Sequence, residues 1–70
     1  MTREIVGKCL LLELLNKSYM TQTDLSIKTG ISKQQINEYI GGTRLMSIYN
    51  AKLIAKALAC KIDDLYEWKL

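Results

Sequence analysis

Two short helix-forming segments separated by a glycine constrain the fold of this chain more than any other feature. One opens with Thr-x-x-Asp at residues 21–24 and the other with Ser-x-x-Gln at residues 32–35. Both patterns are capping boxes, in which side chains bond the free N–H groups of a helix N-terminus. Gly30 lies between them and can adopt the left-handed conformation that ends a helix. The sequence therefore predicts helices over residues 22–28 and 32–40, joined by a tight turn.

The rest of the chain also has helical periodicity. Proline is absent, and no stretch alternates apolar and polar residues over the length of a strand. We therefore expect further helices over residues 3–16, 45–59 and 62–68. The predicted fold is all-α, a compact bundle of about five short helices in a single domain over residues 1–70.

The first expected helix begins after Thr2, a possible N-cap, and is apolar nearly all round. Tight burial in a small bundle and a surface for a partner both explain this pattern. The face expected to be buried consists of Ile5, Cys9, Leu12 and Leu15.

The sequence offers no arrangement of residues for catalysis or metal binding. It has no histidine, and its two cysteines lack metal-ligand spacing. Paired carboxylates in a cleft and a glycine-rich phosphate loop are also missing. We therefore expect no enzymatic activity, metal, cofactor or small-molecule ligand. With reduced thiols, no apolar run near 20 residues and no signal peptide, we expect a cytoplasmic protein that does not enter a membrane.

Positive charge is concentrated in the middle of the chain. The net charge is +3, and residues 1–16 and 53–70 each hold as many acidic as basic side chains. Residues 17–52 thus carry the whole excess, so a polyanion should bind there. The charged residues of this middle segment are Lys17, Lys28, Lys33, Arg44 and Lys52, with Asp24 and Glu38.

The segment QTDLSIKTGISKQQINEYI, which begins at residue 22, resembles the helix-turn-helix motif of the phage repressor and Cro family. The motif spans about residues 22–41. Leu25, Ile31 and Ile36 match the apolar positions that lock the two helices together, and Ser26 matches a position that must be small. The resemblance implies a helix-turn-helix DNA-binding domain.

Residues 41–58, GGTRLMSIYNAKLIAKAL, are similar to the loop and fourth helix of the phage lambda repressor DNA-binding domain, and residues 54–65 resemble the end of the same domain. This resemblance implies a lambda-repressor-like fold in which the loop contacts base edges and phosphates. The loop candidates are Arg44, Ser47, Tyr49 and Asn50.

The second helix of the motif is expected to enter the major groove with its first turn leading. Lys33 can donate to guanine O6/N7, and Gln34 can pair with adenine N6/N7. Glu38 can accept from cytosine N4 or simply remain solvated. The other DNA-binding candidates on the two helices are Thr21, Gln22 and Asn37.

The C-terminal end is rich in large apolar side chains that either fold back or meet a second subunit. A core of this size rarely supplies more than about 3–5 kcal/mol, and pairing adds both stability and affinity. We therefore expect a homodimer that binds an approximately palindromic operator, with half-sites about one DNA turn apart. The candidate dimer residues are Leu65, Tyr66, Trp68 and Leu70.

These observations predict a sequence-specific regulator of transcription that binds double-stranded DNA, a small repressor or Cro-like switch protein of a phage or bacterium. The alternative is a protein-interaction module, such as an antitoxin or anti-repressor, that uses the same fold to bind a protein. The apolar C-terminal end favours that alternative.

Overall fold

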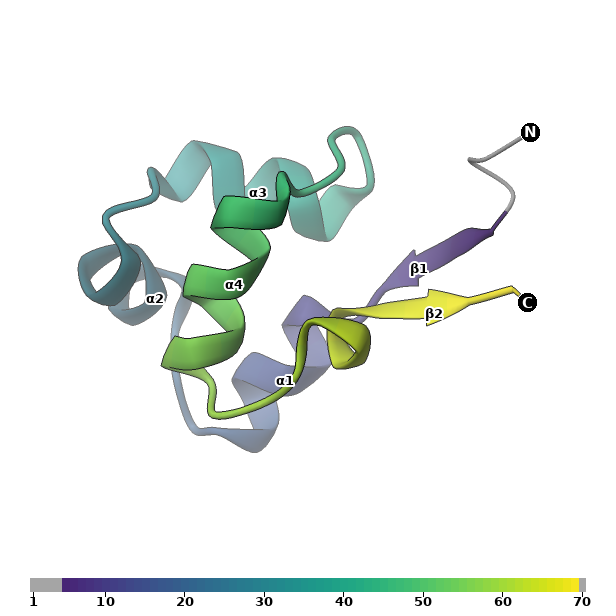
Figure 1. Cartoon of the computed structure of the whole chain (residues 1–70). Coiled ribbons are helices and arrows are strands. Elements are labelled where there is room, and N and C mark those ends of the chain that lie inside the picture. The colour runs from purple at the N-terminus through teal and green to yellow at the C-terminus, as the bar shows by residue number, and fades with distance from the viewer. Residues whose placement is uncertain (1–4, 70) are drawn as a thin grey trace.

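The computed structural model describes residues 5–69 of the chain (Figure 1). Within this range, helices pack around a common core and two short strands lie side by side near the chain ends. In chain order the elements are β1 (Val6–Cys9), α1 (Leu11–Lys17), α2 (Gln22–Thr29), α3 (Lys33–Gly41), α4 (Ile48–Ala57), the 3-10 helix η2 (Ile62–Leu65) and β2 (Tyr66–Trp68).

The prediction of an all-α fold with five helices is wrong at both ends of the chain. The expected helix over residues 3–16 is β1 followed by the shorter α1, and that over residues 62–68 is η2 followed by β2. Four α-helices, the 3-10 helix η2 and a two-stranded sheet therefore make up the described part of the domain.

The two strands form an antiparallel ribbon that joins the beginning of the described chain to its end. Val6 lies opposite Trp68 and Cys9 opposite Tyr66, with an irregular register between these pairs. Gly7 lies in that irregular stretch, where a Cβ atom would come within 3.0 Å of the Glu67 carbonyl oxygen. Aromatic and β-branched side chains favour such pairing, so long-range contacts override the local helical pattern.

The ribbon also changes which leucines of the N-terminal segment are buried. Leu11 and Leu15 are inside the core, whereas Ile5 and Leu12 are 39% and 43% exposed. The predicted buried face is therefore wrong for these last two residues, because the single long helix on which it was based does not form. Thr2, the expected N-cap, lies outside the described residues.

The core lies where α1, α2, α3, α4 and η2 meet, and the ribbon extends from one side of this helical body (Figure 1). Every described element except β2 contributes a buried apolar side chain, and no polar or charged residue in the described part of the chain is buried. The buried residues are Cys9, Leu11, Leu15, Leu25, Ile31, Ile36, Tyr39, Ala51, Ile54, Ala55, Leu58 and Leu65.

The two central helices form as their capping residues predict. The Thr21 hydroxyl accepts from the Asp24 N–H, and the Thr21 N–H donates to the Asp24 carboxylate, both at 3.0 Å. At the start of α3, the Ser32 hydroxyl accepts from the Gln35 N–H at 3.1 Å, but the reciprocal bond from the Gln35 side chain that would complete the predicted capping box is not formed. Gly30 ends α2 with a φ of 78°. These local bonds set the turn between α2 and α3.

Replacement of Leu65 by alanine should destabilise the domain strongly. Leu65 is fully buried where η2 packs against α4, and truncation of such a leucine costs about 2–5 kcal/mol. Leu12→Ala is the matched control, because Leu12 is 43% exposed. Urea unfolding followed by Trp68 fluorescence should show a much larger loss for the first variant. Equal losses would contradict this description of the core.

The capping box of α2 should make stability depend on pH. The hydrogen bond from the Thr21 N–H lowers the pKa of Asp24 below its ordinary value of 3.8. The ionised carboxylate therefore stabilises the folded chain above that value, and the stabilisation is lost as pH falls through the lowered pKa. Asp24→Asn should unfold at lower urea than the parent at neutral pH, and the difference should shrink below pH 3.8. Asp63→Asn controls for loss of one negative charge. A difference that stays constant with pH would contradict the prediction.

Candidate nucleic-acid interface

One face of α3 is available to a ligand. Ile36 and Tyr39 are buried, whereas Lys33, Gln34 and Asn37 are exposed. Ile36 and Tyr39 are three residues apart and share the buried face, whereas Lys33 and Gln34 lie four and three residues before Asn37 and share the exposed one with it. The structure thus brings three of the predicted recognition residues to one exposed surface.

The N-terminus of α3 is suited to an anion. Its first turn contains Lys33 and no acidic residue, and the N–H groups of a helix N-terminus attract negative charge. The Ser32 hydroxyl accepts the N–H of Gln35 and leaves other N–H groups of that turn without a capping partner. This end of the helix can therefore receive a phosphate or a base edge.

Helix α2 supports α3 from below. Ser26 donates its hydroxyl proton to the Ile31 carbonyl at 2.6 Å, across the turn. Thr29 donates to the Leu25 carbonyl at 2.8 Å and accepts from the Ile31 N–H at 3.2 Å. Ser26 therefore acts by hydrogen bonding as well as by its small size, and together with Thr29 it fixes Ile31 in the turn between the helices.

The two candidates at the start of α2 have different surroundings. The hydroxyl and N–H of Thr21 are both used in the capping box with Asp24. Gln22, the first residue of the helix, is half-buried. Gln22 is thus placed to brace a neighbour or contact a ligand, and Thr21 mainly sets the helix end.

The loop after α3 is held to the last turn of that helix. Gly42, with a φ of 80°, donates its N–H to the Tyr39 carbonyl at 3.2 Å. The N–H of Thr43 reaches the Glu38 carbonyl at 3.1 Å. These bonds form a Schellman motif. Beyond it, the Arg44 Nε donates to Glu38 Oε1 at 2.8 Å, so two predicted DNA-binding residues are bonded to each other.

The other end of the loop is held by α4 and by the ribbon. The Ser47 hydroxyl caps α4 by accepting from the Asn50 N–H at 3.1 Å. The Met46 N–H donates to the Tyr66 hydroxyl at 3.1 Å. Burial raises the pKa of Tyr66 above its ordinary value of 10.0. This role of Tyr66 could not be predicted from the sequence, because its partner Met46 lies far away along the chain.

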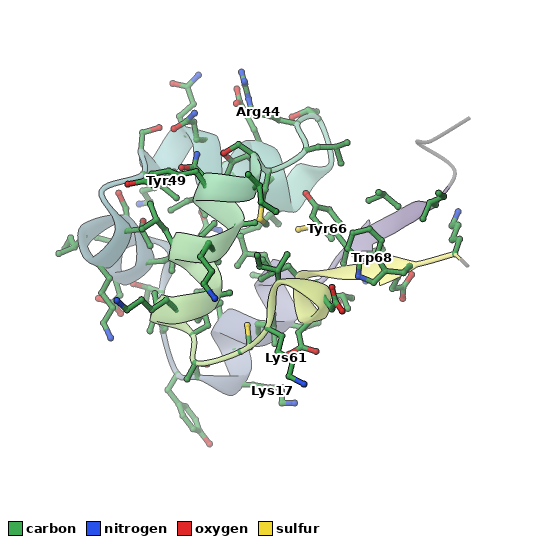
Figure 2. All side chains as sticks on the ribbon, viewed as in Figure 1. Lys17, Arg44, Tyr49, Lys61, Tyr66 and Trp68 are labelled. Carbon is green, nitrogen blue, oxygen red and sulfur yellow. The ribbon has the colours of Figure 1, made fainter. Side chains whose placement is uncertain are left out.

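Helix α4 is joined directly to α3 by a pair of polar side chains. Asn50 donates from Nδ2 to the Tyr39 hydroxyl at 2.9 Å. Tyr39 is only 2% exposed, so Asn50 satisfies a nearly buried hydroxyl group. Its neighbour Tyr49 is 71% exposed and lies on the surface (Figure 2). Of these two candidates, Tyr49 is the one with a freely accessible side chain.

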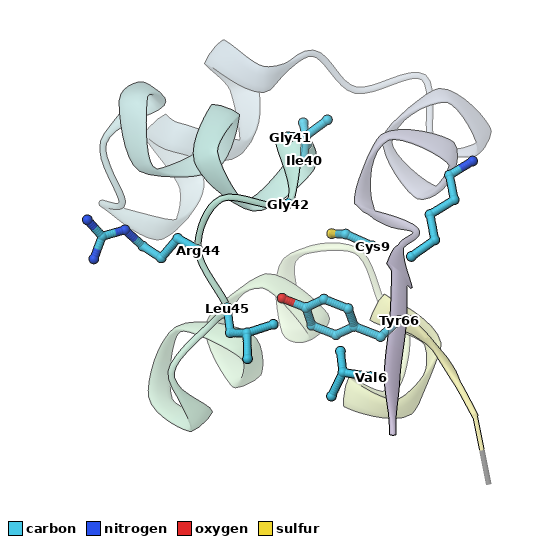
Figure 3. Close-up of a pocket in the computed structure, with 10 residues that line it drawn as sticks. Val6, Cys9, Ile40, Gly41, Gly42, Arg44, Leu45 and Tyr66 are labelled. Atoms are coloured by element: carbon cyan, nitrogen blue, oxygen red, sulfur yellow. The ribbon is translucent and has the colours of Figure 1, made fainter. Parts of the chain in front are cut away.

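A pocket of about 360 Å³ lies between β1, the end of α3 and the loop (Figure 3). Val6, Ile40, Leu45 and Tyr66 contribute to its lining. Arg44 borders the pocket, but its guanidinium points away from it (Figure 3). The charged end of this side chain is thus separated from the ribbon.

The four candidate dimer residues are not equally accessible. Leu65 has no exposed surface, so in this fold it belongs to the core of its own chain. Tyr66 is half-buried and braces the loop. Trp68 is 42% exposed and donates its indole N–H to the Asp63 carbonyl at 2.9 Å. Leu70 lies outside the described residues.

Over residues 5–69, the structure has no group of three or more histidine, cysteine, aspartate or glutamate residues that could hold a metal ion. Both cysteines are free, and burial raises the pKa of the Cys9 and Cys60 thiols. In the same range, each helix is too short or too polar to cross a membrane.

Comparison with known proteins agrees with this geometry. The Cro/C1-type HTH DNA-binding domain matches residues 11–70. The chain is 47% identical over 66 residues to the SPbeta prophage-derived HTH-type transcriptional regulator YopS of Bacillus subtilis (strain 168). The matched region covers 93% of this chain and 89% of that relative. It is 42% identical over 57 residues to YotL, another SPbeta prophage-derived HTH-type transcriptional regulator of that strain, with coverage of 80% and 71%.

Proposed function

The chain belongs to the Cro/C1-type helix-turn-helix DNA-binding domain family, and we propose from this premise how it acts as a DNA-binding regulator of transcription. In this proposal, α3 lies in the major groove of double-stranded DNA and reads a specific sequence. The observation that carries the proposal is the outward face of α3, where Lys33, Gln34 and Asn37 are exposed together above buried Ile36 and Tyr39.

Each exposed residue of α3 has a chemical role in this proposal. Lys33 donates to guanine O6/N7, and Gln34 pairs with the N6 and N7 atoms of adenine. Asn37 lies one turn further along and can make the same kind of pair as Gln34. Lys28 and Lys52 are exposed basic residues of the middle segment and attract phosphates without reading sequence.

The proposed biological form is a homodimer on an approximately palindromic operator. Two features support pairing through the ribbon. Ile5 and Trp68, at its open end, leave apolar surface exposed at 39% and 42%, and the domain has one small core, which pairing would reinforce. A two-fold axis would place two copies of α3 about one DNA turn apart.

Repression is the simplest consequence of such binding, because a dimer that occupies an operator can block transcription without a further surface. The SPbeta prophage origin of both relatives supports a phage or bacterial setting, and we propose that the protein acts in the cytoplasm, where that DNA lies.

Selection of binders from random double-stranded DNA at near-physiological salt should enrich a palindrome with half-sites about one turn apart. Lys33→Ala should then relax base preference at one position in each half-site. Lys52→Ala should instead weaken binding to all sequences about equally and reduce the salt dependence. If Lys33→Ala left the enriched sequence unchanged, the assignment of α3 as the reading element would be wrong.

Sedimentation should show a dimer of the parent protein at micromolar concentration. Trp68→Ala should shift it toward monomer, because the variant removes the largest exposed apolar side chain of the ribbon. Ile27→Ala is the control, since Ile27 is 78% exposed but lies on α2. A parent protein that is monomeric and enriches no DNA sequence would contradict the proposal and favour a protein-interaction module such as an antitoxin.

A further inference from the structure

The end of α3 holds the beginning of the loop at a single residue. The Glu38 carbonyl accepts both the N–H of Thr43 at 3.1 Å and its hydroxyl at 3.3 Å. The Glu38 carboxylate accepts the Arg44 Nε–H at 2.8 Å. Glu38 thus fixes the backbone of Thr43 and the side chain of Arg44. This arrangement depends on the left-handed turn at Gly42.

We propose that Glu38 is a positioning residue that aims Arg44 at a pair of hydrogen-bond acceptors on DNA. A guanidinium has five N–H donors in a rigid plane. Because Glu38 engages Nε, the edge formed by the two terminal nitrogens remains available for two parallel hydrogen bonds. The side chain extends from the domain on the side of α3 (Figure 2). This inference rests on the proposed function.

The acceptor pair is either guanine O6/N7 or two phosphate oxygens, because both match the terminal edge of arginine. Glu38 is less exposed than Arg44, with 31% and 55% of their side chains accessible. The carboxylate is therefore the more enclosed member of the pair. Its Oε1 accepts from Arg44, and in this proposal Glu38 supports the arginine rather than accepting from cytosine N4.

The sign of one mutational effect separates this role from simple electrostatics. A carboxylate near DNA repels phosphates, so its loss should tighten binding if charge alone mattered. Positioning predicts the opposite result: Glu38→Ala should weaken binding to the enriched operator by about tenfold, within the range of one good bidentate pair. Glu38→Gln should retain most of the affinity, because its amide oxygen can still accept from Arg44 Nε.

The experiment measures operator affinity by fluorescence anisotropy for the parent, Glu38→Ala, Arg44→Ala and the double variant. We expect Glu38→Ala to have no weakening effect when Arg44 is already alanine. Tighter binding by Glu38→Ala, or additive losses in the double variant, would overturn the proposal. Glu13→Ala is the control, since Glu13 also forms an exposed ion pair, at 3.0 Å from Lys8. An equal loss for this control would also overturn it.

Repeated selection with Arg44→Ala identifies the acceptor. Loss of preference for guanine at one position indicates base contact, whereas a uniform loss with a salt slope smaller by about one indicates phosphate contact. Either result supports the proposal, and an unchanged affinity and motif contradict it. If the parent enriches no motif, the proposed function fails and this inference fails with it. An enriched motif with independent effects of Glu38 and Arg44 overturns the positioning role alone.

Discussion

Burial of Ile36 and Tyr39 decides both that α3 exists and which of its faces is left exposed. A helix of nine residues is not stable alone in water, since isolated helices need about 12–15 residues to be even marginal. It forms here because these two side chains are enclosed by the rest of the core. The same burial orients Lys33, Gln34 and Asn37 outward, so the stability of the fold and the geometry of recognition have one physical cause.

Sequence patterns predicted the centre of the domain because its signals are local. Thr21, Ser32 and Gly30 act on backbone groups within a few residues of themselves. Helices α2 and α3 therefore formed as expected. The ribbon was missed because Val6 and Trp68 lie far apart along the chain. Helical spacing of leucines near the N-terminus says nothing about a strand partner at the other end. Pairing between the two strands therefore overrode the local helical pattern of the N-terminal segment.

The candidate site shows the same division. Lys33 and Gln34 could be named in advance because the helix-turn-helix resemblance identified the recognition helix, and both are exposed on α3. Arg44 was reached by family resemblance, and its bond to Glu38 could not be predicted because it requires the left-handed backbone of Gly42. Tyr66 was named for a different role, as a dimer residue. Its hydroxyl accepts the Met46 N–H, which links the missed ribbon to the loop.

The loop between α3 and α4 is held at both ends before any ligand binds, and this matters for a protein with so little net charge. At +3, nonspecific attraction to DNA is modest, and the Glu38–Arg44 pair further reduces the local positive charge. In the proposed mode of binding, discrimination between sequences depends on directed hydrogen bonds, which are most effective when the donor is already in place. Glu38, Ser47 and Tyr66 each bond part of the loop. If the loop contacts DNA as proposed, less ordering is left to occur on binding, so more of the energy of each base contact is available for distinguishing one sequence from another.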